Sequence, residues 1–108
     1  FYNIVLKVST NLLPLDLINI CKSIEIKLGR KKKAKNAPRE CDIDIIDFNS
    51  KKMNGHLILP HPRMHKRNFV LFPLFELDKT WKHPRTKRHI KSLILDLPNS
   101  DISSIKQI

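Results

Sequence analysis

Long apolar runs and cysteines are scarce in this sequence, and both absences restrict the class of protein. No stretch of about 18 consecutive apolar residues occurs, so we expect no membrane-spanning helix. The only cysteines are Cys21 and Cys41, too few for the disulfide framework of a small secreted domain, and neither lies in a cluster of metal ligands. Because aliphatic residues lie close to both, we predict buried free thiols and a reducing, cytoplasmic location.

Acidic and aromatic side chains are also few. Ten acidic residues stand against 21 basic ones, which gives a net charge of +11 and a pI of about 10.0. This balance predicts an anionic partner, such as nucleic acid, an anionic lipid or a polyphosphate substrate. Aromatic residues make up 6% of the chain and form no RNA-recognition motif, which argues against a nucleic-acid-binding module. At 108 residues, the chain has the size of a single domain.

The first local patterns predict a strand followed by a helix. Residues 1–9 alternate as in a strand with one strongly apolar face. Residues 14–28 have helical spacing, with Pro14 in the first turn, where its missing N–H costs nothing. The apolar stripe expected to face the core is Leu17, Cys21, Ile24 and Leu28.

The second half predicts further strands and two helices. Residues 41–48 form a second predicted strand, and a turn at Asn54-Gly55 leads to a short apolar run at 57–59. Helices are expected within 64–77, interrupted by Pro73, and over 87–97, capped by Thr86. The inward residues of the last helix are Ile90, Leu93, Ile94 and Leu97. We therefore expect an α+β fold with helices packed on a mostly antiparallel sheet.

Asp42 and Asp44 lie two residues apart within the second predicted strand. Side chains alternate along a strand, so the two carboxylates are predicted to share one face. They repel each other unless a cation lies between them, and Mg²⁺ is commonly held by one or two carboxylates with substrate phosphates and water. The spacing alone also allows an ordinary solvent-facing pair.

A basic segment, residues 30–40, precedes this pair and contains six cations, among them Arg30, Lys32 and Arg39. Cations beside a metal ion could neutralise phosphate oxygens in a phosphoryl-type transfer. A solvated charge run or a nucleic-acid-binding patch is the alternative interpretation.

Two further groups of residues suggest ligand contacts. His61 lies between two prolines on a rigid turn, and Arg67 and Phe69 follow it closely. Phe1 and Asn3 share a predicted strand face, where an aromatic ring could stack on a heterocycle and an amide could read its edge. Core packing is the alternative for both aromatic residues.

Taken together, these strings resemble one family, the hydroxymethyl-dihydropterin pyrophosphokinases of folate biosynthesis. The most specific strings are APRECDIDI at 37–45 and PHPRMHKRNFVL at 60–71. FYN at 1–3, Glu25 with LGR at 28–30, Pro73-Leu74, and Trp81 with His83-Pro84 continue the resemblance in unbroken order. The resemblance implies a single pyrophosphokinase domain with a ferredoxin-like α+β fold.

The resemblance also implies the reaction and its metal. The β,γ-diphosphate of ATP would pass to the hydroxymethyl group of 6-hydroxymethyl-7,8-dihydropterin, with release of AMP, in a monomeric enzyme. Asp42 and Asp44 would hold two Mg²⁺ ions, and the loop bearing Arg30 and Lys32 would close over the phosphates beside Arg39. The implied ATP-binding residues are Glu25, Arg39, His61 and Arg67. The implied pterin-binding residues are Phe1, Asn3, Asp42 and Phe69.

The sequence departs from the family pattern in three places. Lys32 stands where arginine is frequent, which keeps the charge but loses the bidentate fork. Asn36 stands where many members have tryptophan. The opening strand and first helix of the family have no counterpart, so we expect residues 1–108 to be the C-terminal two-thirds of the domain and to be unstable or aggregation-prone alone. A nucleic-acid-binding module, a metal-dependent nuclease using the same aspartates and a non-catalytic remnant are the alternatives.

Overall fold

A computed structural model describes residues 3–29 and 42–98 of the chain. Three α-helices, one 3₁₀ helix and one two-stranded antiparallel sheet are assigned within these ranges. They are α1 (Pro14–Lys27), β1 (Met53–Asn54), β2 (Ile58–Leu59), η1 (Met64–Lys66), α2 (Asn68–Leu77) and α3 (Ile90–Leu95). The fold is therefore α+β, as predicted. In the described residues, no helix is both long and apolar enough to cross a membrane.

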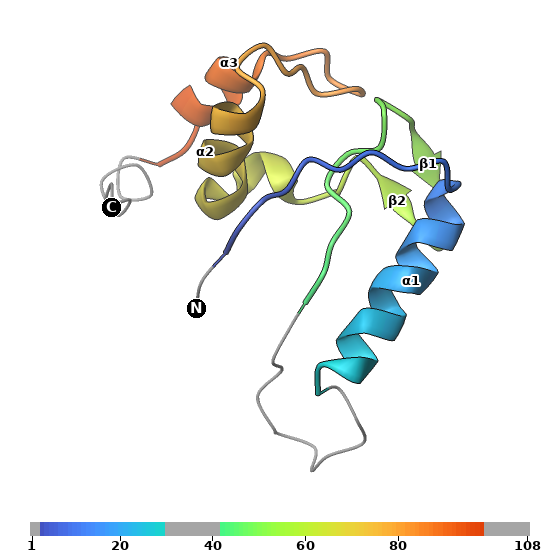
Figure 1. Cartoon of the computed structure of the whole chain (residues 1–108). Coiled ribbons are helices and arrows are strands. Elements are labelled where there is room, and N and C mark those ends of the chain that lie inside the picture. Colours follow the sequence, from blue (N-terminus) through green and yellow to red (C-terminus); the bar gives the residue numbers. More distant parts are fainter. Residues whose placement is uncertain (1–2, 30–41, 99–108) are drawn as a thin grey trace.

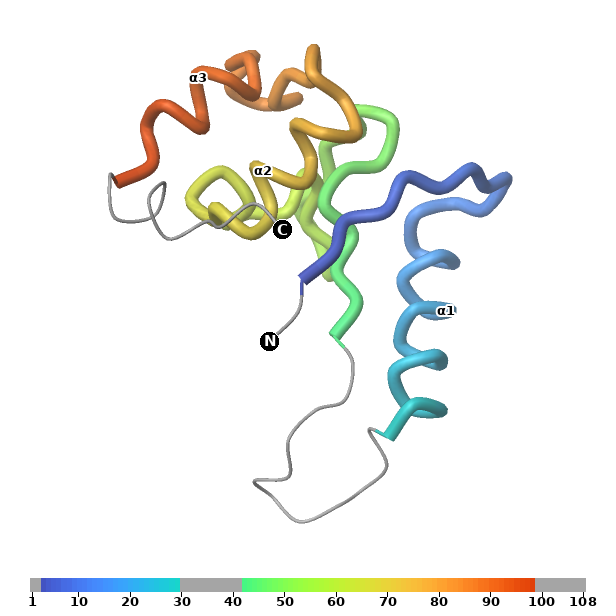
Figure 2. Tube along the Cα trace, turned by 60° about the vertical axis from the view of Figure 1, so that its left-hand side comes forward, coloured from blue at the N-terminus to red at the C-terminus, as the bar shows by residue number. Residues whose placement is uncertain are grey.

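Helix α1 confirms the helix predicted over 14–28, although it turns a different face inward. Pro14 occupies the first turn, and the buried residues are Pro14, Cys21 and Glu25. Of the expected apolar stripe, Ile24 is 40% exposed and Leu28 is 50% exposed. The physical reason is that α1 stands apart from α2 and α3, with the extended segments 3–9 and 42–47 between them (Figures 1 and 2).

The strands predicted over 1–9 and 41–48 are wrong for the described parts of both ranges. Residues 3–9 and 42–47 are extended but belong to no assigned strand. They cross close to each other in both views (Figures 1 and 2). An extended segment counts as a strand only when a neighbour completes its ladder of hydrogen bonds. The apolar face of the first segment is consequently exposed, at 77% for Ile4, 72% for Leu6 and 66% for Val8.

The turn at Asn54-Gly55 is confirmed as the tip of a short hairpin. Strands β1 and β2 are antiparallel, and Met53 is paired with Leu59 while Asn54 is paired with Ile58. Leu59 is fully buried, and the chain continues from it through Pro60 to His61. The sheet is thus limited to two short strands in the described ranges, and the hairpin leads directly into the predicted ligand-contact region.

The core lies around η1, α2, α3 and the segment between the two helices, so the described helices pack mainly on one another and not, as expected, on the antiparallel sheet. The predicted interruption at Pro73 is also wrong, because α2 runs through it. Proline removes one hydrogen bond from a helix interior, and burial of apolar side chains on both sides of it offsets that cost. The buried cluster consists of Met64, Val70, Leu71, Leu74, Trp81, Ile90, Leu93 and Leu97.

Helix α3 begins three residues later than predicted. Lys87 has a φ of 61°, a left-handed conformation that cannot continue a right-handed helix. The N-cap is His89, whose Nδ1 accepts a hydrogen bond from the Lys91 amide at 3.1 Å, and the predicted cap by Thr86 is wrong. The inward face is confirmed, since Ile90, Leu93 and Leu97 are buried.

Candidate active site

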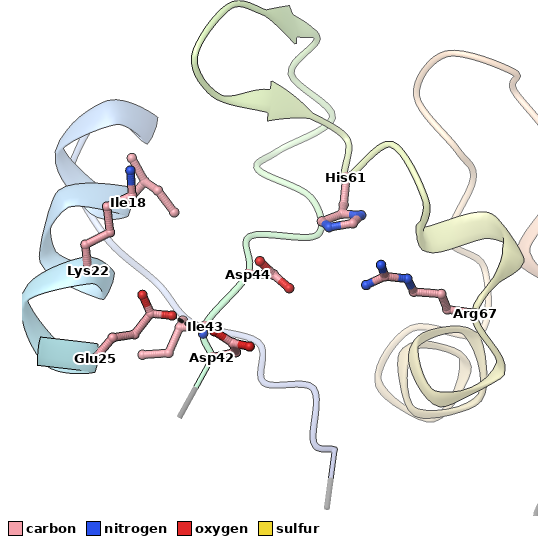
Figure 3. A pocket seen from close by; sticks show the side chains of 8 residues that line it. All are labelled: Ile18, Lys22, Glu25, Asp42, Ile43, Asp44, His61 and Arg67. Atoms are coloured by element: carbon pink, nitrogen blue, oxygen red, sulfur yellow. Dashed lines mark hydrogen bonds between the residues drawn. The ribbon is translucent and has the colours of Figure 1, made fainter. Parts of the chain in front are cut away.

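An open cavity of about 420 Å³ lies between α1, the 42–44 segment and the turn that leads into α2. Its lining joins three carboxylates and three basic side chains from distant parts of the sequence (Figure 3). Five of these residues were predicted as site residues from the sequence. The lining residues are Ile18, Lys22, Glu25, Asp42, Ile43, Asp44, His61 and Arg67.

Glu25 connects α1 to the segment that carries the aspartates. It is 5% exposed, and its Oε2 accepts a hydrogen bond from the Ile43 amide at 2.7 Å. A charged acceptor makes this bond stronger than one between neutral groups. Because Ile43 lies between Asp42 and Asp44, Glu25 fixes the backbone at the middle of the predicted metal-binding pair.

Asp42 and Asp44 are both exposed, whereas Ile43 between them is half-buried. In Figure 3 their carboxylates lie on the side of the segment that faces Arg67, and the Ile43 side chain extends toward α1. The alternation expected of an extended chain is therefore present even though no strand is assigned here. This arrangement leaves both carboxylates accessible from the cavity.

His61 is held in place by its own backbone and by the turn that follows it. Its amide donates to the Ile46 carbonyl at 2.8 Å, and its Nδ1 accepts from the Arg63 amide at 3.2 Å. With Nδ1 accepting, the proton of the neutral ring is on Nε2. Burial lowers the pKa of His61, the Asp44 carboxylate opposes this shift, and Arg67 and Arg63 add to it. His61 is accordingly a hydrogen-bond donor through Nε2 near neutral pH.

Arg67 is half-buried and extends into the cavity toward the Asp44 side (Figure 3). Its Cζ also lies 5.6 Å from the centroid of the Phe69 ring, within the range of a cation–π contact. Phe69 is 42% exposed, so an aromatic surface is accessible next to the cavity without lining it. Asn3 is exposed and is not among the lining residues.

Several predicted site residues fall outside the part of the chain that the structure describes. Phe1 precedes it, and the remainder belong to the basic segment before Asp42. These are Arg30, Lys32 and Arg39. Cys41, predicted to be a free thiol, also lies outside the described residues. Cys21 is a buried free cysteine, as predicted.

Sequence reasoning missed Ile18 and Lys22, which line the cavity from α1. Both could have been found, since residues 18, 22 and 25 follow one another at the spacing of a single helix face. Lys22 adds a cation from a helix that was expected to contribute only Glu25. The spacing of these residues was overlooked because the core-facing stripe was assigned to a neighbouring face of the same helix.

The side chains of the cavity suit a hard cation that also binds substrate phosphates and water. Within the described ranges no group of three or more His, Cys, Asp or Glu residues could hold a metal ion by itself. Mg²⁺ does not require such a cage, because it commonly binds one or two carboxylates together with substrate phosphates and water. Asp42 and Asp44 fit this requirement, and Lys22, His61 and Arg67 surround them with donors for phosphate oxygens.

Comparison with known proteins assigns the chain to a family. Residues 1–79 match the 7,8-dihydro-6-hydroxymethylpterin-pyrophosphokinase family. The chain is 39% identical over 92 residues to a 2-amino-4-hydroxy-6-hydroxymethyldihydropteridine pyrophosphokinase of Aquifex aeolicus, covering 84% of the chain and 58% of that protein. It is 41% identical over 78 residues to the protein of the same name from Bacillus subtilis, covering 71% of the chain and 47% of that protein.

A third relative is much longer than the chain. A folic acid synthesis protein of Dictyostelium discoideum is 42% identical over 100 residues, which cover 92% of the chain and 15% of that protein. The chain thus spans about half the length of the two pyrophosphokinases and a small part of this larger protein. The match over residues 1–79, which contain every lining residue of the cavity, establishes that the chain belongs to the 7,8-dihydro-6-hydroxymethylpterin-pyrophosphokinase family.

Proposed function

We propose that the protein transfers the diphosphate group of MgATP to 6-hydroxymethyl-7,8-dihydropterin and releases AMP. The observation that carries this proposal is the cavity, in which two accessible carboxylates lie beside Lys22, His61 and Arg67. In the reaction, the hydroxymethyl oxygen forms a bond to the β-phosphorus while the bond from that phosphorus to the α,β-bridging oxygen breaks. The hydroxyl proton leaves to water or to a carboxylate, and no covalent enzyme intermediate is required.

The proposed roles follow from the chemistry of each side chain. Asp42 and Asp44 would hold Mg²⁺, two ions in our proposal, and the metal would supply charge neutralisation at the phosphate oxygens. Arg67 and Lys22 extend positive charge along the polyphosphate, and His61 donates a hydrogen bond through Nε2. Catalysis of this kind depends on orientation and on electrostatic stabilisation of the oxygens rather than on a nucleophilic side chain.

Glu25, for which the resemblance implies a role in ATP binding, also contacts the segment that carries the aspartates. Its carboxylate is buried and holds the Ile43 amide, so it orients the aspartates through the backbone. We propose that it acts as a positioning residue in addition to the ATP-binding role expected from the resemblance. Arg30, Lys32 and Arg39 keep the phosphate-binding roles proposed for them from the sequence.

For the pterin, we propose that Phe69 stacks on the ring. Its exposed aromatic face beside Arg67 supports this role. Phe1 on the opposite side of the ring, Asn3 at its edge and Asp42 close to the hydroxymethyl group complete the proposed pterin site. The ferredoxin-like arrangement of one pyrophosphokinase domain, the monomeric state and the cytoplasmic location also remain proposals.

Two alternatives explain the positive charge but not the rest of the site. A nucleic-acid-binding module does not account for accessible carboxylates among the basic side chains, because they repel a phosphate backbone unless a metal intervenes. A metal-dependent nuclease could use Asp42 and Asp44, but the family match does not favour it. Magnesium-dependent binding of ATP compared with DNA separates the nuclease from the kinase.

The decisive experiment measures AMP release from MgATP, with and without the pterin. The protein is produced from its complete coding sequence, and Asp42→Asn and Asp44→Asn are assayed beside it. Each substitution keeps the shape of the side chain but removes the negative charge, so we expect kcat to fall by about 10²-fold or more. Asp16→Asn, an exposed aspartate on α1 that does not line the cavity, is the matched control.

The outcomes separate the claims. AMP that forms only with pterin, and disappears in both variants but not in the control, supports the function and the metal role together. Full activity in either variant would refute the metal assignment. A folded protein that releases no AMP would refute the proposed reaction.

A further inference from the structure

A short segment after residue 79 makes hydrogen bonds to both of the backbone segments that lead to the cavity. The match ends at residue 79, and the residues after it include Trp81 and Arg85. Neither lines the cavity, yet each makes a hydrogen bond to a residue that lies two or three positions from a lining residue. We call Trp81 and Arg85, with their respective partners Asp47 and Leu59, the brace.

The first half of the brace fixes the segment of the aspartates. The indole Nε1 of Trp81 donates to Asp47 Oδ2 at 3.1 Å. Trp81 is buried, and it belongs to the same core cluster as α2 and α3. Asp47 is three residues beyond Asp44, so the indole ties the end of the 42–47 segment to the core.

The second half of the brace fixes the hairpin that leads to His61. Nη2 of Arg85 shares its two hydrogens among three acceptors, the Leu59 carbonyl at 2.9 Å, the Met53 carbonyl at 2.9 Å and Asn54 Oδ1 at 2.6 Å. These acceptors belong to both strands of the hairpin. Leu59 is fully buried and lies two residues before His61, so Arg85 sets the position from which the His61 turn starts.

Two further hydrogen bonds link the Trp81 half of the brace to the Arg85 half. On the cavity side, the His61 amide donates to the Ile46 carbonyl at 2.8 Å, one residue before Asp47. On the far side, the buried His83 orders the segment, because its Nδ1 accepts from the Arg85 amide at 3.2 Å. The chain from Trp81 to Arg85 therefore contacts both the 42–47 segment, which carries Asp44, and the hairpin that precedes His61.

We propose that Arg85 and Trp81 are positioning residues for the active site, and that they act by setting the relative placement of Asp44 and His61. The proposal rests on the proposed function for its catalytic consequence, but its structural part does not. Transfer reactions that depend on orientation are sensitive to small displacements of the groups that contact the substrate. A residue that touches no substrate can thus govern the rate through the backbone.

The test compares two arginines three residues apart. Arg85→Met removes the three hydrogen bonds to the hairpin while keeping an unbranched apolar stem. Arg88→Met is the matched control, because the Arg88 guanidinium donates to Ser92 and pairs with Asp96 around α3, and within residues 3–29 and 42–98 it makes no hydrogen bond to the hairpin. Both variants lose one positive charge from the same segment, so a difference between them reports the hairpin bonds.

Two readouts are taken on the protein made from its complete coding sequence. The amide NMR signal of His61 in the ligand-free protein reports the bond to Ile46, and we expect it to shift in Arg85→Met but not in Arg88→Met. In the AMP-release assay we expect kcat to fall about tenfold or more in Arg85→Met, with less than about a threefold change in KM for ATP. Arg88→Met is expected to stay within about twofold of the parent.

Each outcome decides the proposal. An unmoved His61 signal with parental kcat in Arg85→Met overturns it, and so do equal losses in both variants, which indicate a general loss of stability. If Arg85→Met does not fold, Trp81→Phe, which removes the indole N–H together with part of the ring volume and keeps a smaller aromatic ring in the core, is judged by the same two readouts. A parent protein without AMP release refutes the proposed function, and the His61 signal then decides the brace by itself.

Discussion

The hydrogen bond from the Ile43 amide to Glu25 provides a local test of how the aspartate pair is held. The carboxylate is 5% exposed and its Oε2 lies 2.7 Å from the amide nitrogen. Replacement of Glu25 by Ala removes the acceptor and leaves a part-buried N–H without it. Replacement by Gln keeps an acceptor oxygen but removes its charge.

The magnitude follows from the type of bond. A hydrogen bond to a charged group contributes about 1.5–3 kcal/mol, and one between neutral groups about 0.5–1.5 kcal/mol. We therefore expect Glu25→Ala to destabilise the bonded state by about 2 kcal/mol, and Glu25→Gln by about 1 kcal/mol. With a factor of ten for each 1.4 kcal/mol, these values correspond to increases in local opening of about 30-fold and about fivefold.

Amide hydrogen exchange measured by NMR is the appropriate assay, because it reports local opening even where global unfolding is not cooperative. The exchange rate of the Ile43 amide is compared between parent, Glu25→Gln and Glu25→Ala. The matched control is Glu76→Ala, an exposed glutamate on α2 for which we expect a change within about 0.5 kcal/mol.

The reasoning fails if the Ile43 amide exchanges equally fast in Glu25→Ala and in the parent. It also fails if Glu76→Ala accelerates this amide as much as Glu25→Ala does, because the effect would then be global. A graded order of parent, Gln and Ala, seen at Ile43 and not at the amide of His61, would support a positioning role for Glu25.

Three further predictions concern pH, thiol reactivity and self-association. Burial lowers the pKa of His83 below its ordinary value of 6.5, so the folded state binds fewer protons than the unfolded chain. The neutral His83 ring contributes to stability above a pH of about 6.5, and this contribution is lost as the pH falls toward the pKa of the folded state. The urea midpoint of the parent should therefore decrease over this pH range. The decrease should be smaller in His83→Asn, because the Oδ1 of asparagine can replace the accepting Nδ1. Burial raises the pKa of the Cys21 thiol, and the charge of Glu25 adds to this shift. In a Cys41→Ser background we therefore expect iodoacetamide to alkylate Cys21 about tenfold faster in urea than in buffer. The exposed apolar segment around Leu6 predicts that the 108-residue chain aggregates, so Leu6→Lys should reduce the light scattering of this chain.

Each of these predictions has a contradicting result. Parallel pH profiles for His83→Asn and the parent would show that this ring does not couple folding to protonation. Equal alkylation rates in buffer and in urea would place Cys21 outside the core. A cooperative urea transition of the 108-residue chain by circular dichroism, without light scattering, would contradict the expected instability.

The features that were predictable from the sequence depend on neighbouring residues. The start of α1 at Pro14, the hairpin turn at Asn54-Gly55 and the inward face of α3 were all expected correctly. Each arises from local backbone preference or from periodicity within one element. The same is true of the shared face of Asp42 and Asp44, since an extended chain alternates its side chains whether or not a ladder forms.

Other features could not be predicted because they depend on which backbone lies alongside. The segments 3–9 and 42–47 have strand-like patterns but belong to no assigned strand, since a period of two selects extended backbone and not its partner. The cap of α3 moved to His89 because Lys87 adopts a left-handed conformation within a turn closed by backbone hydrogen bonds between His83 and both Lys87 and Arg88. The inward rotation of Glu25 likewise depends on the position of Ile43.

By itself the sequence determined the family, because the strings around positions 42–44 and 61–67 specify it, and it determined which residue types are available for the proposed binding of a hard cation and of phosphate oxygens. The tertiary structure alone decided how these groups are held. Glu25 meets Ile43 across 18 positions, and Arg85 meets Leu59 across 26, so no local pattern encodes either bond. Hydrogen bonds over such separations exist only once packing has brought the two backbones together, which is why neither bond was predicted from the sequence.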